Sequence, residues 1–177
     1  SNINVRQHLM PRCIIVIVRR GKNAGGRWRA KKGIGMSEHG YYIEDLSPGM
    51  TATFGKTITE ADILMFAGVS GDTNPVHLNQ EFAMETAFQG RIAHGMLTAS
   101  LISTVIGTKL PGPGCIYLTQ TLRFMQPVRA GDTVTAHVSI REINVEKRRL
   151  TMDTACRVGG KDVLIGEALI MVNRKPA

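Results

Sequence analysis

The chain has 177 residues, 43% of them hydrophobic, which is sufficient for one domain with an apolar core. Its formal net charge of +8 is high enough for a nucleic-acid-binding protein, but the charge is unevenly distributed. Residues 1–35 hold nine Lys/Arg and no acidic residue, whereas residues 36–177 hold thirteen Lys/Arg and fourteen acidic residues, a net charge of −1. The near-neutral second segment therefore offers no electrostatic footprint for nucleic acid.

Residues 1–35 form a basic leader for which three interpretations stay open. It is a mitochondrial-type targeting segment, sequence upstream of a natural start at Met36, or a basic arm that binds an anionic partner. Within it, Cys13–Val18 has the character of an edge strand, and its six apolar residues are far fewer than the roughly 18 of a membrane span. We expect the bacterial cytoplasm, or the mitochondrial matrix if the leader is a targeting segment.

The cysteines do not predict a disulfide framework. Cys13, Cys115 and Cys156 are far apart, odd in number and without a CxxC motif. This pattern is typical of buried or inert thiols in a reducing compartment.

The domain expected over residues 36–177 begins with a strand and a helix. Met50–Lys56 alternates between apolar and polar residues, as a strand does. Thr59, followed three residues later by Asp62, predicts a capping box at the start of a helix. The glycines at positions 68 and 71 predict the end of that helix.

Two further helices are predicted before residue 114, where the hydrophobic period changes. Asn79 can cap a short helix that runs through Ala87. Met96–Ile106 is apolar nearly all round, and such a helix should be buried in the core.

After residue 114 the hydrophobic period changes from 3.6 to 2, which predicts strands. They are expected over residues 115–125, 133–141, 150–158 and 162–173. Gly159-Gly160 is a strong two-residue hairpin signal. The resulting antiparallel meander needs a partner for its apolar face, and Met96–Ile106 is the obvious one. We therefore predict an α+β hot-dog fold, in which a curved antiparallel sheet is wrapped around one long buried helix.

The loop after the first predicted helix holds two residues capable of acid/base chemistry. Asp72 and His77 lie five positions apart in Ser70–His77 (Ser-Gly-Asp-Thr-Asn-Pro-Val-His). Pro75 pushes Asn74 out of the helical region and favours a turn on which both side chains converge. A carboxylate and an imidazole that hold one water can move a proton near neutral pH. The spacing is equally compatible with a turn or N-cap role for Asp72 and a loop role for His77.

His94-Gly95 precedes the buried helix and predicts a second part of the site. N–H groups of a first helical turn lack internal partners, and glycine lets a ligand approach the backbone. The Gly95 N–H is therefore a candidate oxyanion donor, although glycine also allows close helix–sheet packing. For His94 we favour a cap or core-edge position beside the substrate. Ser100 either hydrogen-bonds the Asp72 carboxylate or lines the pocket, or it bonds back to its own helix.

Other catalytic motifs are absent. There is no GxSxG, Walker A or zinc motif, and Gly21–Gly26 does not follow a strand in a βαβ unit. We expect no metal and no cofactor, because the histidines do not group at metal-ligand spacing. They are His8, His39, His77, His94 and His137.

Three segments carry a resemblance to a known family. They are Gly71–His77 (Gly-Asp-Thr-Asn-Pro-Val-His), His94–Met96 (His-Gly-Met) and Leu110–Cys115 (Leu-Pro-Gly-Pro-Gly-Cys). Together they resemble the MaoC-like (R)-specific enoyl-CoA hydratases, including those that feed polyhydroxyalkanoate synthesis, and the mitochondrial 3-hydroxyacyl-thioester dehydratases. The resemblance extends over residues 41–173. It implies reversible hydration of a trans-2-enoyl thioester, of CoA or acyl carrier protein, to the (R)-3-hydroxyacyl thioester.

The resemblance also implies roles for individual residues. Asp72 and His77 correspond to the catalytic dyad, and Gly95 corresponds to the backbone donor to the oxyanion. Ser100 corresponds to a serine implicated in the site, and Asn74 corresponds to the asparagine that orders the loop. The family pairs two copies near the acyl tunnel, so a homodimer is expected.

Two other classes of function stay open. A hot-dog acyl-CoA thioesterase usually carries its carboxylate on the central helix, whereas Met96–Ile106 contains no Asp or Glu. A non-catalytic acyl-CoA-binding protein, or a nucleic-acid protein that uses the basic leader, would have no need of the Asp72–His77 pair. The partners we expect are a thioester substrate and a second copy, with no nucleic acid and no membrane.

Overall fold

The computed structural model describes residues 39–176. The predictions for the basic leader, residues 1–35, and for a strand over Cys13–Val18 lie outside the described residues. A short 3-10 helix, η1 (Ile43–Asp45), precedes the first strand. Across residues 39–176, no helix is long and apolar enough to cross a membrane.

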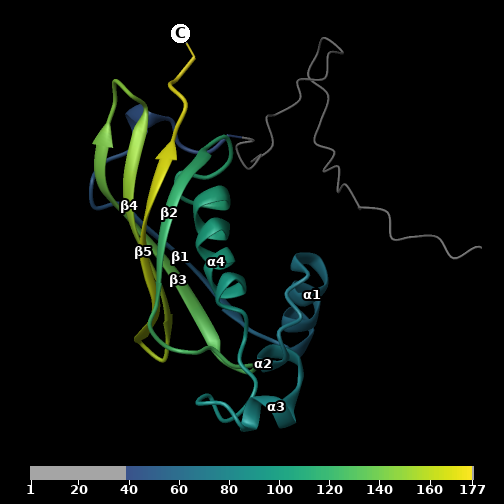
Figure 1. The fold of residues 1–177 in the computed structure, drawn as a ribbon. Coiled ribbons are helices and arrows are strands. Elements are labelled where there is room, and N and C mark those ends of the chain that lie inside the picture. The colour runs from purple at the N-terminus through teal and green to yellow at the C-terminus, as the bar shows by residue number, and fades with distance from the viewer. Residues whose placement is uncertain (1–38, 177) are drawn as a thin grey trace, which may run out of the picture. The chain divides into compact units, whose positions relative to one another are not determined.

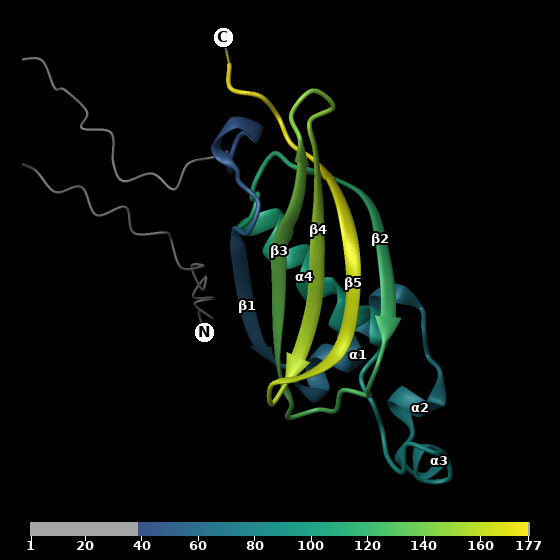
Figure 2. The same cartoon turned by 90° about the vertical axis from the view of Figure 1, so that its left-hand side faces the viewer.

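A five-stranded antiparallel sheet with one helix packed on it forms an α+β hot-dog fold (Figures 1 and 2). The strands are β1 (Thr51–Thr57), β2 (Ile116–Phe124), β3 (Thr133–Asn144), β4 (Arg149–Val158) and β5 (Lys161–Met171). The spatial order is β1-β3-β4-β5-β2, so that β3, β4 and β5 form the predicted meander. At the turn between β4 and β5, Gly159 and Gly160 have φ values of 56° and 81°, as a type I′ hairpin requires.

The position of β2 differs from the predicted meander. β2 does not pair with β3, its successor in the chain. It pairs with β5 and is itself the strand at the far edge of the sheet. β3 pairs with β4 on one side and with β1 on the other, from Thr51↔Ser139 to Thr57↔Thr133. It therefore has no edge left for β2. The loop from β2 to β3 therefore has to cross the end of the sheet, and this loop borders the site described below.

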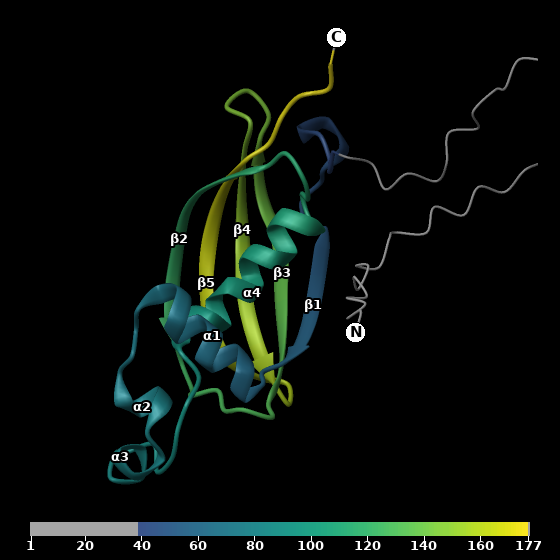
Figure 3. The same ribbon diagram turned by 90° about the vertical axis from the view of Figure 1, so that its right-hand side faces the viewer.

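Helix α4 (Gly95–Thr108) lies across one face of the sheet and contacts β1, β3 and β4 (Figure 3). Its buried apolar residues are Leu97, Leu101, Ile102, Val105 and Ile106. Alternate residues of the central strands face them: Val134, Ala136, Val138, Ile140, Leu150, Met152 and Cys156. The removal of these two apolar faces from water is the main source of stability.

One stripe of α4 contradicts the prediction of a helix buried all round. Met96, Ser100, Ser103 and Gly107 are exposed, and their spacing places them on a single side of the helix. The apolar composition concealed this stripe, because its members are a methionine, a glycine and two serines. Most of the helix is buried as predicted, but one side is not covered by its own sheet.

Helix α1 (Glu60–Ser70) begins at the predicted capping box. Thr59 Oγ1 accepts the Asp62 N–H at 3.2 Å, and Asp62 Oδ2 accepts the Thr59 N–H at 2.8 Å. Gly71 ends the helix in the left-handed region, with φ of 76°. Gly68 lies inside the helix, so the prediction that it helps to end α1 is wrong.

Two short helices follow and lie with α1 near the N-terminal end of α4 (Figures 1 and 3). They are α2 (Pro75–Leu78) and α3 (Gln80–Met84). Asn79 caps α3, as predicted, by accepting the Phe82 N–H at 3.1 Å. The helix ends at Met84, earlier than the expected Ala87, so the chain turns away sooner and the loop to α4 is longer.

Candidate functional site

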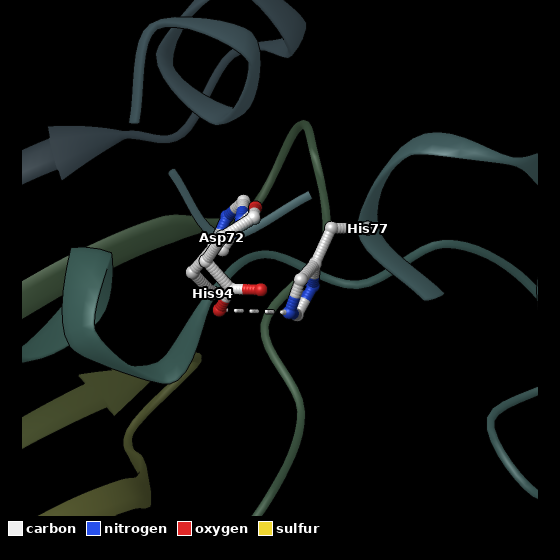
Figure 4. Close-up of side chains that lie close together, drawn as sticks. All are labelled: Asp72, His77 and His94. Carbon is white, nitrogen blue, oxygen red and sulfur yellow. Dashed lines mark hydrogen bonds and ion pairs between the residues drawn. The ribbon is translucent and has the colours of Figure 1, made fainter. Parts of the chain in front are cut away.

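The turn between α1 and α2 places the Asp72 and His77 side chains next to each other (Figure 4). Asp72 Oδ1 accepts the Asn74 N–H at 3.2 Å, while Oδ2 faces His77 Nε2 at 4.0 Å. Asn74 in turn caps α2 by accepting the Val76 N–H at 3.2 Å, and Pro75 occupies the first helical position. The turn role of Asp72 therefore uses Oδ1 and leaves Oδ2 facing His77, while the acid/base role stays a prediction.

A backbone carbonyl group fixes the tautomer of His77. Its Nδ1 lies 2.9 Å from the carbonyl oxygen of Ile92. Because a carbonyl oxygen can only accept, Nδ1 carries the hydrogen, and the neutral ring has its lone pair at Nε2. The 4.0 Å between Nε2 and Asp72 Oδ2 is too long for a hydrogen bond. Two acceptors at this separation can share one bridging water.

His94 packs against this pair and is almost fully buried, with 1% of its surface exposed. Its ring stacks on that of His77, with centroids 3.8 Å apart, and it also contacts Phe66. Its Nε2 lies 2.9 Å from the backbone carbonyl oxygen of Asp72. The position at the core edge is confirmed, but the side chain of this N-cap residue makes no capping hydrogen bond.

Asp72, His77 and His94 also form a group of potential metal ligands within the described residues. Their donor atoms lie within 4.8 Å of one another. Because His77 and His94 are 17 positions apart in the sequence, their spacing did not indicate this grouping. The absence of a metal stays a prediction.

Gly95 begins α4 beside this cluster. The first-turn N–H groups of a helix have no intrahelical partner, and Gly95 lines the adjoining cavity. A Cβ atom on Gly95 would lie 2.7 Å from the ring of Phe124. The lack of a side chain at Gly95 allows Phe124 of β2 to pack closely, as the packing interpretation expects. Gly95 also borders the cavity, and its role as an oxyanion donor stays a prediction.

The cluster borders a cavity of about 660 Å³, a size typical of small-molecule sites. Apart from the polar cluster, large apolar side chains dominate its lining. They are Phe66, Phe88, Ile92, Met96, Phe124 and Met125. The cavity therefore suits a ligand with an apolar chain and one reactive polar end that reaches Asp72 and His77.

Sequence reasoning missed the contribution of the loop that leads into α4 and of the end of β2. Phe88 precedes α4 in the loop, whereas Phe124 and Met125 lie at the end of β2. Nothing in the local pattern of either segment marks it as part of a site. Only the pairing of β2 with β5 at the sheet edge brings Phe124 to Gly95.

Ser100 lies outside this cavity lining. Its Oγ donates to the carbonyl oxygen of Leu97 at 2.6 Å, which is the back-bonding alternative considered for this serine. It belongs to the exposed stripe of α4. A role for Ser100 in substrate binding stays a prediction.

Neither described cysteine offers a nucleophile to the cavity. Burial raises the pKa of the Cys156 thiol to about 12, and burial also raises the pKa of the Cys115 thiol. Since the thiolate is the reactive form, both thiols are inert near neutral pH, as predicted. Cys13 lies outside the described residues.

Comparisons with known proteins point to one family. The sequence profile of the MaoC-like domain matches residues 46–160. An (R)-specific enoyl-CoA hydratase from Rhodospirillum rubrum is 54% identical over 132 residues, which cover 75% of this chain and 92% of the relative. A 3-hydroxybutyryl-CoA dehydratase from Methylorubrum extorquens is 49% identical over 134 residues, which cover 76% of this chain and 85% of the relative. The solved (R)-hydratase from A. caviae, involved in PHA biosynthesis, has a TM-score of 0.71 at 42% identity, covering 73% of this chain and 98% of that chain.

Proposed function

The chain belongs to the MaoC-like domain family, and from this premise we propose that it is an (R)-specific enoyl-CoA hydratase. The reaction is the reversible addition of water to a trans-2-enoyl thioester, which gives the (R)-3-hydroxyacyl thioester. One observation carries the proposal: Asp72 Oδ2 and His77 Nε2 lie 4.0 Å apart at the border of a largely apolar cavity. Relatives at 54% and 49% identity that are named for this chemistry support it.

We propose that Asp72 and His77 hold the attacking water between them. The water donates one hydrogen to the lone pair of His77 Nε2 and the other to the Asp72 carboxylate. As its oxygen attacks C3, His77 takes one proton, and the imidazolium keeps its Nδ1 hydrogen bond to the Ile92 carbonyl. The other hydrogen stays on the new hydroxyl group. The imidazolium then returns its proton to C2 from the same side, so that one water molecule is added overall.

The N–H of Gly95 is our proposed partner for the thioester oxygen. As the nucleophile attacks C3, electron density moves from the C2–C3 double bond onto that oxygen. A donor at the positive end of the α4 dipole is well placed to stabilise this charge. All of these steps use the chain's own groups, and we propose no cofactor apart from the CoA or carrier that is part of the substrate.

An assay with crotonyl-CoA tests the proposed function. A hydratase removes the absorbance of the conjugated enoyl thioester without the release of a free thiol. The alternative, a hot-dog thioesterase, would release CoA and give a signal with a thiol reagent. A purely binding protein would give neither signal, and either of these two outcomes would rule out the proposal.

Gly95→Ala is expected to lower kcat/KM for crotonyl-CoA by about 10- to 100-fold, because displacement of reacting groups is costly. The added methyl group would lie 2.7 Å from the Phe124 ring, which has to move within the cavity. Alanine keeps the N–H donor, so Phe124→Leu in the same chain should restore part of the activity. A wild-type kcat/KM for Gly95→Ala would show that this close contact has no catalytic importance.

We further propose that a second copy of the chain covers the apolar rim of the cavity. Four large apolar side chains that line the cavity are exposed in the isolated chain. They are Met96 at 56%, Phe124 at 52%, Met125 at 45% and Phe88 at 39%. Such a rim beside a cavity is typical of a surface that another chain covers.

The outer edge of β2 is the better candidate for contact between the two copies. The opposite edge strand, β1, has its Thr53 carbonyl occupied by Lys109 Nζ at 2.6 Å, and a lysine at an edge discourages strand pairing. We expect light scattering at micromolar concentration to give twice the chain mass of 19.3 kDa. A stable monomer in a concentration series would contradict the dimer.

A further inference from the structure

We propose that His94 is a positioning residue, which holds Asp72 and His77 at the spacing needed to share one water. This inference rests on the proposed hydratase function of the same site. His94 borders the cavity, but only 1% of its surface is exposed and its ring is stacked on that of His77, so we infer that it acts through the dyad. Figure 4 shows the three side chains together.

One imidazole ring contacts both members of the dyad. On one side, His94 Nε2 lies 2.9 Å from the carbonyl oxygen of Asp72, which can only accept, so Nε2 carries the hydrogen and donates it. On the other side, the ring face of His94 supports the ring of His77 at a centroid distance of 3.8 Å. The backbone of Asp72 and the ring plane of His77 are therefore fixed against the same group.

The unpaired nitrogen of His94 shows that packing alone does not account for this residue. With Nε2 as the donor, Nδ1 holds a buried lone pair that has no partner among residues 39–176. An unsatisfied buried acceptor lowers stability. A phenyl ring of similar shape would fill the space without this cost, but it could not donate to the Asp72 carbonyl. The imidazole therefore lowers stability through its unsatisfied Nδ1, but it supplies the Nε2 hydrogen bond that holds the turn at Asp72.

The position of His94 at the start of α4 has a second consequence. The N-cap residues of α1, α2 and α3 (Thr59, Asn74 and Asn79) each accept a first-turn N–H through the side chain. His94, the N-cap residue of α4, does not, because its ring is directed to Asp72. The partial positive charge at the start of α4 is therefore not offset by a capping oxygen, which favours the proposed contact of Gly95 with the thioester oxygen.

Two substitutions separate the contacts of His94. His94→Phe keeps the ring face and removes the donor, whereas His94→Gln keeps an amide donor and removes the ring. We expect each variant to lower kcat for crotonyl-CoA about tenfold or more, with KM within about threefold of wild type. The melting temperature of His94→Phe should stay close to that of wild type, because the unsatisfied nitrogen is removed.

The decisive measurement adds the same substitutions to an Asp72→Asn chain. If His94 acts through the dyad, His94→Phe and His94→Gln should lower the residual kcat by less than about twofold there. A wild-type kcat for both single variants would overturn the inference. So would a fold-loss of kcat in the Asp72→Asn chain as large as the loss that the same His94 substitutions cause in the wild-type chain. The wild-type protein is assayed first: an inactive wild type would refute the proposed function, whereas an active wild type with unaffected His94 variants would refute only the role of His94.

Discussion

Asp72→Asn is expected to lower kcat for the hydration of crotonyl-CoA by about 100- to 10,000-fold, the usual range for a lost acid/base group. The amide keeps the size of the side chain and an oxygen that can accept the Asn74 N–H. It removes the negative charge beside His77 Nε2, which the imidazolium needs as it takes the proton from water. The rate is followed through the enoyl absorbance at saturating substrate.

A matched control is available on the far side of the sheet. Asp153 is an exposed carboxylate on β4 that pairs with Arg141 at 2.9 Å and does not line the cavity. Asp153→Asn should leave kcat unchanged, and both variants should melt close to the wild-type temperature. Near-wild-type activity of Asp72→Asn would show that the dyad assignment is wrong.

Ile102→Ala is expected to lower the free energy of unfolding by about 2–5 kcal/mol, the range for truncation of a large core residue. Ile102 lies on the sheet-facing side of α4 and is 1% exposed. Its side chain belongs to the core that α4 shares with β3 and β4. Urea unfolding at a fixed protein concentration measures the loss, because association would otherwise shift the apparent stability.

The next residue along the helix provides the control. Ser103 is exposed, and Ser103→Ala should change the free energy of unfolding by less than about 0.5 kcal/mol. The contrast between adjacent positions tests which face of α4 packs on the sheet. Equal losses for Ile102→Ala and Ser103→Ala would contradict the observed orientation of the helix.

The fold was predictable where local periodicity and burial agree. The alternation in β3 and β4 and the apolar run of α4 identified the sheet and the helix that packs on it, because each pattern follows from the geometry of one element. The place of β2 at the far edge was not predictable, since strand pairing depends on contacts distant in the sequence. The exposed stripe of α4 was missed because serine, glycine and methionine are compatible with either environment.

In the candidate site too, residues in one local turn were predictable, whereas contacts between distant segments were not. Asp72 and His77 were found because a turn of six residues contains both, and the Asn74-Pro75 step predicts that turn. The contacts of His94 were not predictable, because its ring meets a carbonyl group 22 residues earlier in the chain. The proximity of Phe124 to Gly95 depends on the placement of β2 and therefore on the tertiary fold.

The stereochemistry of the hydration product tests the central proposal most directly. Purified wild-type protein is incubated with trans-crotonyl-CoA, and the 3-hydroxybutyryl thioester is analysed by chiral chromatography against both enantiomers. The proposed function predicts the (R) enantiomer as the sole product, and its loss in Asp72→Asn. Formation of the (S) enantiomer, or release of CoA without hydration, would contradict it.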